Sequence, residues 1–271
     1  MSVSIPFCKT WTAPLEAEYV AQVLNGESAT DGQLAESSSQ LLEERLGVGR
    51  VLLAPSCTSA LELAALLCEL GPGDEVVMPS FTFPATANSV ARTGATPVFV
   101  DVRADTMNID EQLIPAALTE RTKAIFVMHY GGVVCEMDAI NDNAAQRGLV
   151  VVEDAAQGID ASYHGRAAGS LAPLAAFSFH HTKSVTCGEG GALCVNDPAL
   201  LERAETVHEH GTNRKQFLRG AVEKYTWVDT GTSGLLNELA CAQLLVRLPV
   251  FHDLTVEDQQ RVIDEVLGFF G

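Results

Sequence analysis

The sequence lacks the features that mark several large classes of protein. No GxGxxG segment follows the first predicted strand and no GxxxxGK occurs, so the dinucleotide and P-loop fingerprints are missing. No apolar run is long enough to span a bilayer, and no basic stretch followed by an apolar segment marks a secretory leader. Basic residues are few, 17 against 35 acidic ones, which argues against nucleic-acid and anionic-membrane partners. We therefore expect a soluble cytoplasmic protein.

Cysteine is present, but its pattern does not indicate disulfides. The seven cysteines are an odd number and include no CxxC pair. We expect reduced thiols, several of them filling the core, as in proteins of a reducing compartment. They are Cys8, Cys57, Cys68, Cys135, Cys187, Cys194 and Cys241.

Short apolar runs alternate with helical patterns along most of the chain. Strands that are apolar throughout and separated by helices are typical of a mainly parallel sheet covered on both faces. The 47% apolar content is ample for such a core, so the expected fold class is α/β, with the sheet between helices. Strands are predicted at 51–54, 76–78, 97–100, 124–127, 149–152, 175–179 and 192–195, and helices at 59–70, 85–92, 114–118, 138–147, 198–210 and 235–248.

Both ends of the chain carry further helical patterns. Those near residues 15–24 and 34–46 predict an arm packed on the main domain. Residues 257–270 predict a last amphipathic helix, for which Thr255 is the expected N-cap.

Four short segments fall at strand ends, where ligands of such sheets gather. Residues 55–60 offer small side chains, hydroxyls and a helix N-terminus to an anion, although a plain N-cap explains them too. Residues 80–83 offer aromatics that either stack on a planar ring or fill the core. Asp154 either pairs with a pyridine nitrogen or caps a helix. Ser178 and Lys183 offer a hydroxyl and an amine able to form a Schiff base, so the set suits a pyridine aldehyde with a phosphate.

On these residues the chain resembles the DegT/DnrJ/EryC1/StrS sugar aminotransferases, pyridoxal 5'-phosphate (PLP) enzymes of the aspartate aminotransferase-like fold (PLP fold type I). The resemblance runs from Ile5-Pro6-Phe7 to about Leu248. Within the family it is greater to members that form dTDP-4-amino-4,6-dideoxygalactose. The segments that carry this narrower resemblance are 101–103, 105–110, 129–132, 211–214, 217–220 and 224–227.

The resemblance implies how the cofactor ring is held. Lys183 would bind the PLP aldehyde covalently, and Asp154 would pair with the pyridine nitrogen. Gln157 would lie against the phenolic oxygen of the ring. Phe83 would stack on the ring, with Phe81 as the second choice.

The resemblance also implies a phosphate site and a subunit interface. Thr58, Ser59 and Ser178 would hold the phosphate. Family sites are built between two subunits, so a homodimer is expected. Relatives often donate an asparagine from the partner subunit in the loop that corresponds to residues 231–234, and this loop contains none.

Three activities are compatible with this resemblance. The first is transfer of an amino group from glutamate to the keto carbon of a nucleotide-linked 4-keto-6-deoxy sugar. The second is a non-catalytic homologue that binds PLP or dimerises, and the third is a PLP-dependent sugar dehydratase. Family dehydratases carry histidine in place of Lys183, so its presence favours transamination, and the neighbouring His180 and His181 are expected to be structural.

The end of the chain departs from the family pattern. Residues 249–271 resemble the last helix of family members. They follow directly on residues 244–247, which resemble a helix that lies about a hundred residues before the last one in relatives. A segment of that length is the size of a small domain. We therefore expect a PLP-binding large domain with its arm over residues 1–248. Residues 249–271 would be the end of a small subdomain whose remainder is absent. Because that subdomain completes one wall of the substrate site in relatives, its absence keeps the non-catalytic alternative open.

Overall fold

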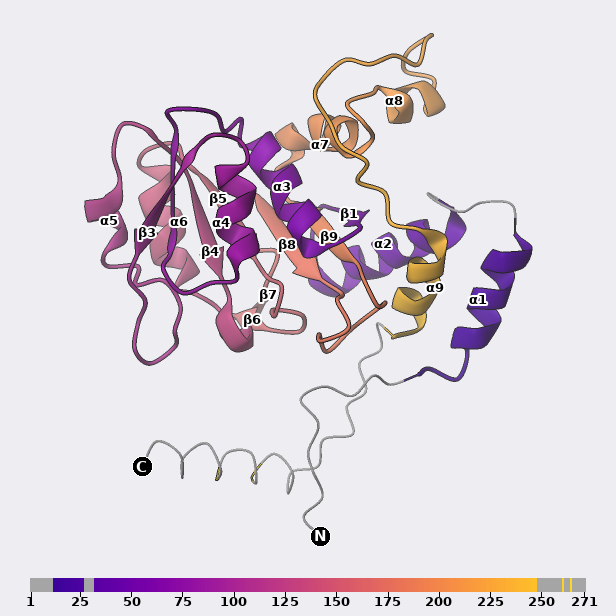
Figure 1. Ribbon diagram of the computed structural model, residues 1–271, viewed down its shortest axis with the longest axis horizontal. Coiled ribbons are helices and arrows are strands. Elements are labelled where there is room, and N and C mark those ends of the chain that lie inside the picture. The colour runs from indigo at the N-terminus through magenta and orange to yellow at the C-terminus, as the bar shows by residue number, and fades with distance from the viewer. Residues whose placement is uncertain (1–11, 27–31, 248–259, 261–263, 265–271) are drawn as a thin grey trace.

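A computed structural model describes residues 12–26, 32–247, 260 and 264 of the chain (Figure 1). The expected N-cap Thr255 and nearly all of the expected helix at 257–270 lie outside these residues, as does most of the proposed segment 249–271. Cys8 and the start of the family resemblance lie outside them as well.

In the described part of the chain, seven strands form one sheet in the order β1-β9-β8-β5-β4-β2-β3. Neighbouring strands are parallel except at β9, which is antiparallel to both β1 and β8. The expected α/β class with a mainly parallel sheet is confirmed. The strands are β1 Arg50–Ala54, β2 Glu75–Pro79, β3 Thr96–Val100, β4 Thr122–Met128, β5 Val150–Asp154, β8 Leu174–Ser178 and β9 Gly191–Val195.

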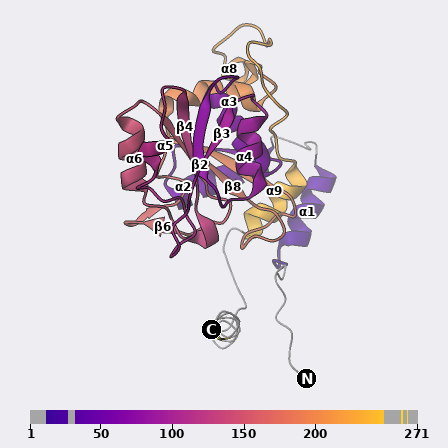
Figure 2. The ribbon, with the colours of Figure 1, turned by 60° about the vertical axis from the view of Figure 1, so that its left-hand side comes forward.

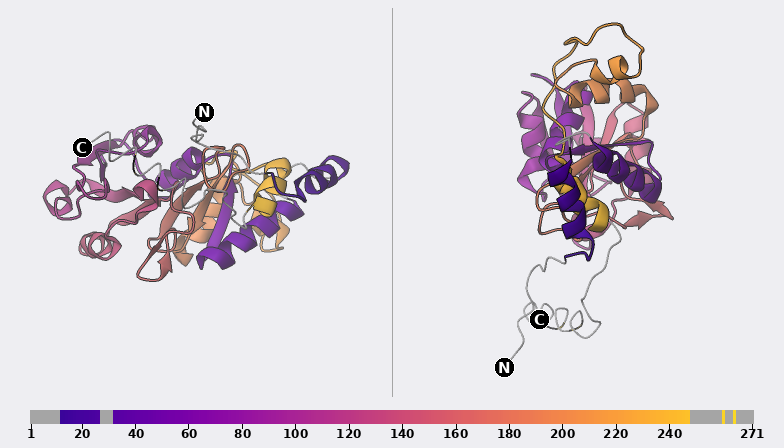
Figure 3. Two further views of the ribbon diagram at one scale, coloured as in Figure 1. Left: turned by 90° about the horizontal axis from the view of Figure 1, so that it is seen from below. Right: turned by 90° about the vertical axis from the view of Figure 1, so that its right-hand side faces the viewer.

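Helices cover both faces of this sheet (Figures 2 and 3). Side chains alternate between the faces with the strand period of two, so that in β1 Leu52 packs in one core and Leu53 in the other. The first face carries α3 (Cys57–Leu67), α4 (Pro84–Ala91) and α7 (Leu201–His208). The second face carries α2 (Gln33–Leu46), α5 (Ile114–Ala117), α6 (Met137–Ala145) and α9 (Glu238–Arg247).

The strand directions bring many chain segments to one edge of the sheet. Because β9 is antiparallel to both of its neighbours, β1 runs in the same direction as the other five strands. The carboxyl ends of six strands and the start of β9 therefore lie along the same edge. In open sheets of this type ligands bind at that edge.

The predicted start of the helix at residue 59 is two residues late. The structure begins α3 at Cys57, because the side chain of Ser56 accepts a hydrogen bond from the Ser59 amide at 3.1 Å and caps the helix. Serine at 56 and serine at 59 are both acceptable caps in the sequence, and the geometry selects the first.

The predicted helix at 198–210 is divided and shorter. A 3-10 turn, η2 (Pro198–Leu200), precedes α7, which ends at His208. The chain leaves the helix because His210 and Gly211 adopt left-handed backbone, with φ of 60° and 71°.

The sequence did not predict several short elements. They are η1 (Tyr130–Gly132), the hairpin of β6 (Ser162–Tyr163) and β7 (Arg166–Ala167), and α8 (Arg214–Leu218). Each is five residues or fewer, too short to show a clear hydrophobic period.

The arm is fixed to the last described helix. In the views of Figures 1 and 3, α1 (Glu16–Asn25) lies beside α9. Arg247 of α9 pairs with Glu16 of α1 at 2.6 Å, and each of these side chains is 9% exposed. Glu238 of α9 accepts hydrogen bonds from the amides of residues 32, 34 and 35, so it caps α2 in place of a local side chain.

The described residues can be compared with the expectations of reduced cysteines and of no membrane-spanning segment. Their six cysteines are all buried and unpaired. None of their helices is both long and apolar enough to cross a membrane.

Candidate functional site

The N-terminus of α3 lies against the start of β9. A Cβ atom on Gly191 would lie 2.4 Å from the Cys57 amide nitrogen and 2.4 Å from the Ser56 carbonyl carbon. Only glycine allows this approach, so Gly191 sets the position of the helix terminus. Thr58 and Ser59 lie in the first turn of α3 and are partly exposed.

This terminus offers a site for an anion. The first amides of a helix have no partner within the helix, and the helix dipole adds a partial positive charge. Ser178, the last residue of β8, is directly paired with Gly191 in the sheet. The predicted phosphate residues Thr58, Ser59 and Ser178 thus come from two strand ends that meet at one glycine.

Asp154 ends β5 with a side chain that is almost completely buried. The hydroxyl of Thr86 donates a hydrogen bond to its Oδ2 at 2.6 Å, and the Ala156 amide donates to Oδ1 at 3.2 Å. Burial raises the pKa of the Asp154 carboxyl, and the Thr86 hydrogen bond opposes that rise. The carboxylate is therefore fixed in place, and a cationic ligand atom beside it would stabilise its charged form.

Cys57 connects the helix terminus to this carboxylate. Its Sγ lies 3.9 Å from Asp154 Oδ1. Burial, followed by the charge of Asp154, raises the pKa of the Cys57 thiol well above its ordinary value. Cys57 is therefore a neutral thiol at pH 7 and packs rather than reacts.

Lys183 brings a positive charge to the same place. Burial raises the pKa of the Asp154 carboxyl and of the Cys57 thiol, and the positive charge of Lys183 acts against that rise in both groups. Lys183 lies in the loop between β8 and β9, where its amide donates to the His180 carbonyl at 2.9 Å. The loop is closed at its base by a hydrogen bond from the Phe179 amide to the Gly190 carbonyl at 2.8 Å.

The two aromatics after β2 differ in exposure and in partners. Phe83 is 67% exposed and is the N-cap residue of α4, so its ring is available to cover a planar ligand. The ring of Phe81 lies 4.7 Å from the ring of Tyr130 and is already engaged. This difference agrees with the preference for Phe83.

Gln157 lies beyond the end of β5 and contacts the turn after β4. Its Oε1 accepts a hydrogen bond from the Gly131 amide at 2.6 Å. The contact fixes the side chain at the same edge of the sheet as Asp154. All seven predicted site residues are therefore at this edge, although their roles toward a cofactor stay predictions.

A buried histidine–glutamate pair supports the edge and was missed by the sequence reasoning. Nε2 of His129 lies 2.9 Å from Glu153 Oε2, and both side chains are fully buried. The Cys135 amide donates to His129 Nδ1 at 3.3 Å, so the ring proton is on Nε2 and points at Glu153. Glu153 also accepts hydrogen bonds from the amides of residues 169, 171 and 172. A glutamate inside an apolar strand was the signal that could have identified this pair.

Thr86 was missed as well. It holds Asp154, and its hydroxyl lies 2.8 Å from that of Thr82, which extends the hydrogen-bonded chain to the β2–α4 loop. A threonine inside a helix carries no sequence signal that distinguishes such a role.

The loop in which relatives often carry an asparagine packs on the end of α7. The Thr232 amide donates to the Val207 carbonyl at 2.8 Å, and the Gly234 amide donates to the His208 carbonyl at 2.9 Å. These bonds occupy the two amides within the same chain.

Comparison with known proteins identifies the family. Residues 12–267 match the sequence profile of the DegT/DnrJ/EryC1/StrS aminotransferase family. The chain belongs to this family. The expected family and its aspartate aminotransferase-like fold are confirmed, and PLP is the cofactor that aminotransferases of this family use.

Two curated relatives illustrate the range of the family. The spore coat polysaccharide biosynthesis protein SpsC of Bacillus subtilis (strain 168) is 33% identical over 265 residues, which cover 97% of this chain and 67% of that protein. The UDP-2-acetamido-2-deoxy-3-oxo-D-glucuronate aminotransferase of Pseudomonas aeruginosa is 38% identical over 217 residues, covering 78% of this chain and 58% of that one.

Solved structures agree with the fold. An aminotransferase from Psychrobacter cryohalolentis superimposes with a TM-score of 0.83 at 32% identity, covering 89% of this chain and 62% of that chain. The PLP-form of a sugar aminotransferase from Streptococcus pneumoniae gives 0.83 at 26% identity, covering 99% and 72%. The chain thus spans 58–67% of the length of these two curated relatives and 62–72% of these two solved chains.

Proposed function

We propose that the chain binds PLP through Lys183 and transfers an amino group from glutamate to the keto carbon of a nucleotide-linked 4-keto-6-deoxy sugar. The proposed product is dTDP-4-amino-4,6-dideoxygalactose. The observation that carries the proposal is the buried Asp154 carboxyl, held by Thr86 and the Ala156 amide at the same edge of the sheet as the loop of Lys183. A lysine and a carboxylate held this way suit the two ends of a pyridine aldehyde.

Besides Lys183, the donor set fits the cofactor at two points. Asp154 would hold a proton on the pyridine nitrogen, because an ion pair there offsets the cost of burying its carboxylate. Thr58, Ser59 and Ser178 would hold the phosphate at the α3 terminus. When bound, PLP supplies an aldehyde that takes up the amino group and a pyridinium ring that withdraws electrons.

Lys183 would also move protons. In the first half of the reaction its Nζ would accept the α-proton of glutamate. In the second half Nζ would deliver a proton to the sugar carbon that gains the amino group. Phe83 and Gln157 would orient the ring during both steps, since one is exposed over the site and the other is fixed by the Gly131 amide.

The organisation of the whole protein is part of the proposal. We assign residues 1–248 to a PLP-binding large domain with its arm, and residues 249–271 to the end of a small subdomain. We also propose a homodimer in the cytoplasm. The six cysteines of the described residues form no disulfide, as expected in a reducing compartment.

Turnover with purified protein tests the proposal. PLP-loaded protein should release 2-oxoglutarate when glutamate is added, and should then aminate a dTDP-linked 4-keto-6-deoxy sugar. PLP binding without either conversion would select the non-catalytic alternative. A product sugar that has lost a hydroxyl group and gained no amino group would select the third alternative, a PLP-dependent sugar dehydratase.

A further inference from the structure

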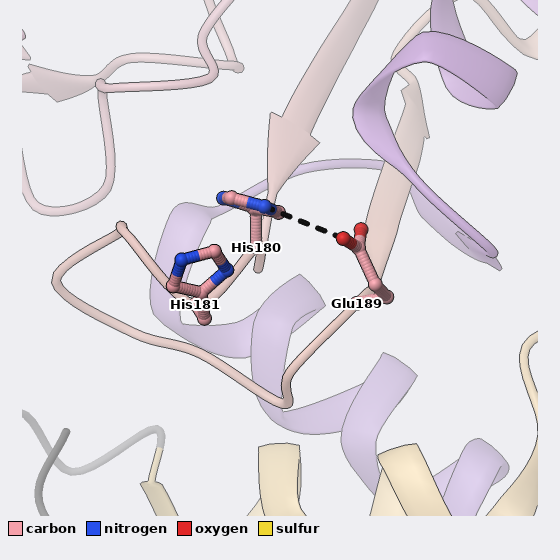
Figure 4. Close-up of side chains that lie close together, drawn as sticks. All are labelled: His180, His181 and Glu189. Atoms are coloured by element: carbon pink, nitrogen blue, oxygen red, sulfur yellow. Dashed lines mark ion pairs between the residues drawn. The ribbon is translucent and has the colours of Figure 1, made fainter.

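Three possible metal ligands gather on the loop that carries Lys183. In the described part of the chain one group of three histidine, cysteine or carboxylate side chains is close enough to share an ion: His180, His181 and Glu189 (Figure 4). One ligand atom from each lies within 4.8 Å of the others. The two histidines follow β8 and the glutamate precedes β9, so the group spans the loop from one side to the other.

Part of this group already has the spacing that a metal ion needs. His180 Nε2 lies 3.3 Å from Glu189 Oε1. Two ligands that each lie about 2.0–2.1 Å from a tetrahedral ion are about 3.3 Å apart. The rings of His180 and His181 have their centroids 4.0 Å apart, and His181 is exposed, so a side-chain rotation can bring its nitrogen to the same ion.

The ring of His180 is oriented by contacts at both of its nitrogens. Its Nδ1 lies 2.9 Å from the Thr182 hydroxyl. The Thr182 amide also donates to Nδ1 at 3.4 Å, so the ring proton is on Nε2 beside Glu189. An ion that binds Nε2 would move this proton to Nδ1, which could then donate it to the Thr182 hydroxyl. Metal-binding histidines are usually oriented in this way by a hydrogen bond from the second nitrogen.

The charge of the protein adds to the attraction. The formal net charge is −18, so the surface field draws cations and not anions. Two imidazoles and one carboxylate select Zn²⁺, Cu²⁺ or Ni²⁺ over Mg²⁺ and Ca²⁺, which prefer oxygen ligands alone.

We propose that His180, His181 and Glu189 bind a divalent transition-metal ion, with water completing its coordination. An ion there would join residues 180 and 189 across the loop and so restrict the segment that holds Lys183. The sequence-based expectation that both histidines are merely structural would then be incomplete.

Titration of the full-length, PLP-loaded protein with Zn²⁺ tests this site. Calorimetry should show one site with micromolar affinity, and Mg²⁺ should give no heat at the same concentrations. His181→Ala and Glu189→Gln should each weaken Zn²⁺ binding by about tenfold or more. Thr182→Val should weaken it by about tenfold, the usual effect of removing a supporting hydrogen bond.

Two control variants separate this site from other ways of binding Zn²⁺. His164 lies 4.0 Å from Asp138 on the exposed surface but forms only a pair, so His164→Ala should leave the affinity unchanged. Lys183→Ala should also leave it unchanged, which would show that the ion is not held by the cofactor at the lysine.

Electron paramagnetic resonance of bound Cu²⁺ gives a second readout. The spectrum should show coupling to two imidazole nitrogens in the unsubstituted protein and to one in His181→Ala, with circular dichroism confirming that each variant is folded. Zn²⁺ affinity weaker than millimolar would overturn the proposal. Affinity that is the same in His181→Ala, Glu189→Gln and the unsubstituted protein would overturn it as well.

Discussion

The buried carboxyl of Asp154, which is proposed to pair with the pyridine nitrogen, lowers the stability of the cofactor-free protein when it is ionised. A carboxyl whose pKa is raised by burial holds its proton more tightly in the folded than in the unfolded chain. Its contribution to stability therefore falls as the pH rises from the ordinary aspartate pKa of about 3.9 through the raised value. A bound cation at the pyridine nitrogen would offset this loss.

Asp154→Asn should accordingly weaken PLP binding without lowering the stability of the cofactor-free protein. At pH 7 the cofactor-free variant should unfold at a denaturant concentration equal to or above that of the parent, because no charge is buried. Its affinity for PLP should fall about 10- to 100-fold, as expected for a lost charge-assisted hydrogen bond of about 1.5–3 kcal/mol. Denaturant unfolding and PLP titration measure the two effects, and a variant that is less stable but binds PLP normally would contradict this role.

Gly191 allows the close approach of β9 to the N-terminus of α3, where the phosphate is proposed to bind. Gly191→Ala should destabilise the protein by about 3 kcal/mol or more, since the new methyl group meets backbone atoms at 2.4 Å, where typical overpacking costs about 1–3 kcal/mol. Gly71→Ala is the matched control, because a Cβ there meets nothing within 4 Å. Equal midpoints of unfolding for the two variants would contradict the close approach.

The sequence was informative about residues whose chemistry is distinctive. Lys183, Asp154 and Ser178 were predicted from residue type and position at strand ends, and the structure brings them to one edge. Thr86 and His129 were missed because their function depends on a partner far away in the sequence, 68 and 24 residues respectively. Such long-range hydrogen bonds leave no local pattern.

At the scale of the element, the N-terminus of α3 combines a helix cap with the proposed anion site. Ser56 caps the helix, and the same terminus is the proposed phosphate site. The ends of the seven predicted strands lie within two residues of those in the structure, because buried strands are continuous apolar runs. Helix ends were less accurate, since caps such as Ser56 are chosen by geometry among several suitable residues.

Ser56→Ala should therefore have two consequences. Loss of the cap should lower the free energy of unfolding by about 1 kcal/mol, and PLP affinity should fall because the terminus frays. Asp197→Ala is the matched control, as Asp197 caps η2 through the Ala199 amide at 2.9 Å and follows the end of β9, at the opposite edge of the sheet from the site. It should lose stability without losing PLP affinity, and a similar loss of affinity in both variants would argue against a specific role of the α3 terminus.

At the scale of the whole molecule, a buried ion pair connects the N-terminal arm to the site. Arg247 of α9 bonds to Glu16 of the arm and also donates to the Thr186 carbonyl at 3.1 Å, three residues after Lys183. Removing one partner of a buried pair leaves the other charge uncompensated, at a cost of about 3–5 kcal/mol. The sequence predicted the arm, but the polar contact that fixes it could not be predicted without the fold.

Glu16→Gln should thus destabilise the protein by about 3–5 kcal/mol, measured by denaturant unfolding. Adding Arg247→Met to this variant should recover much of the loss, because no charge then remains buried. If the double variant is as unstable as the sum of the two single variants, the contact is not a coupled pair.

The most direct test of the central claim is the site of covalent PLP attachment. Protein incubated with PLP and reduced with borohydride should gain the mass of one reduced cofactor on the peptide that contains Lys183. Lys183→Ala should gain none while keeping its circular dichroism spectrum. Attachment to another lysine, or no attachment to the folded unsubstituted protein, would contradict the account.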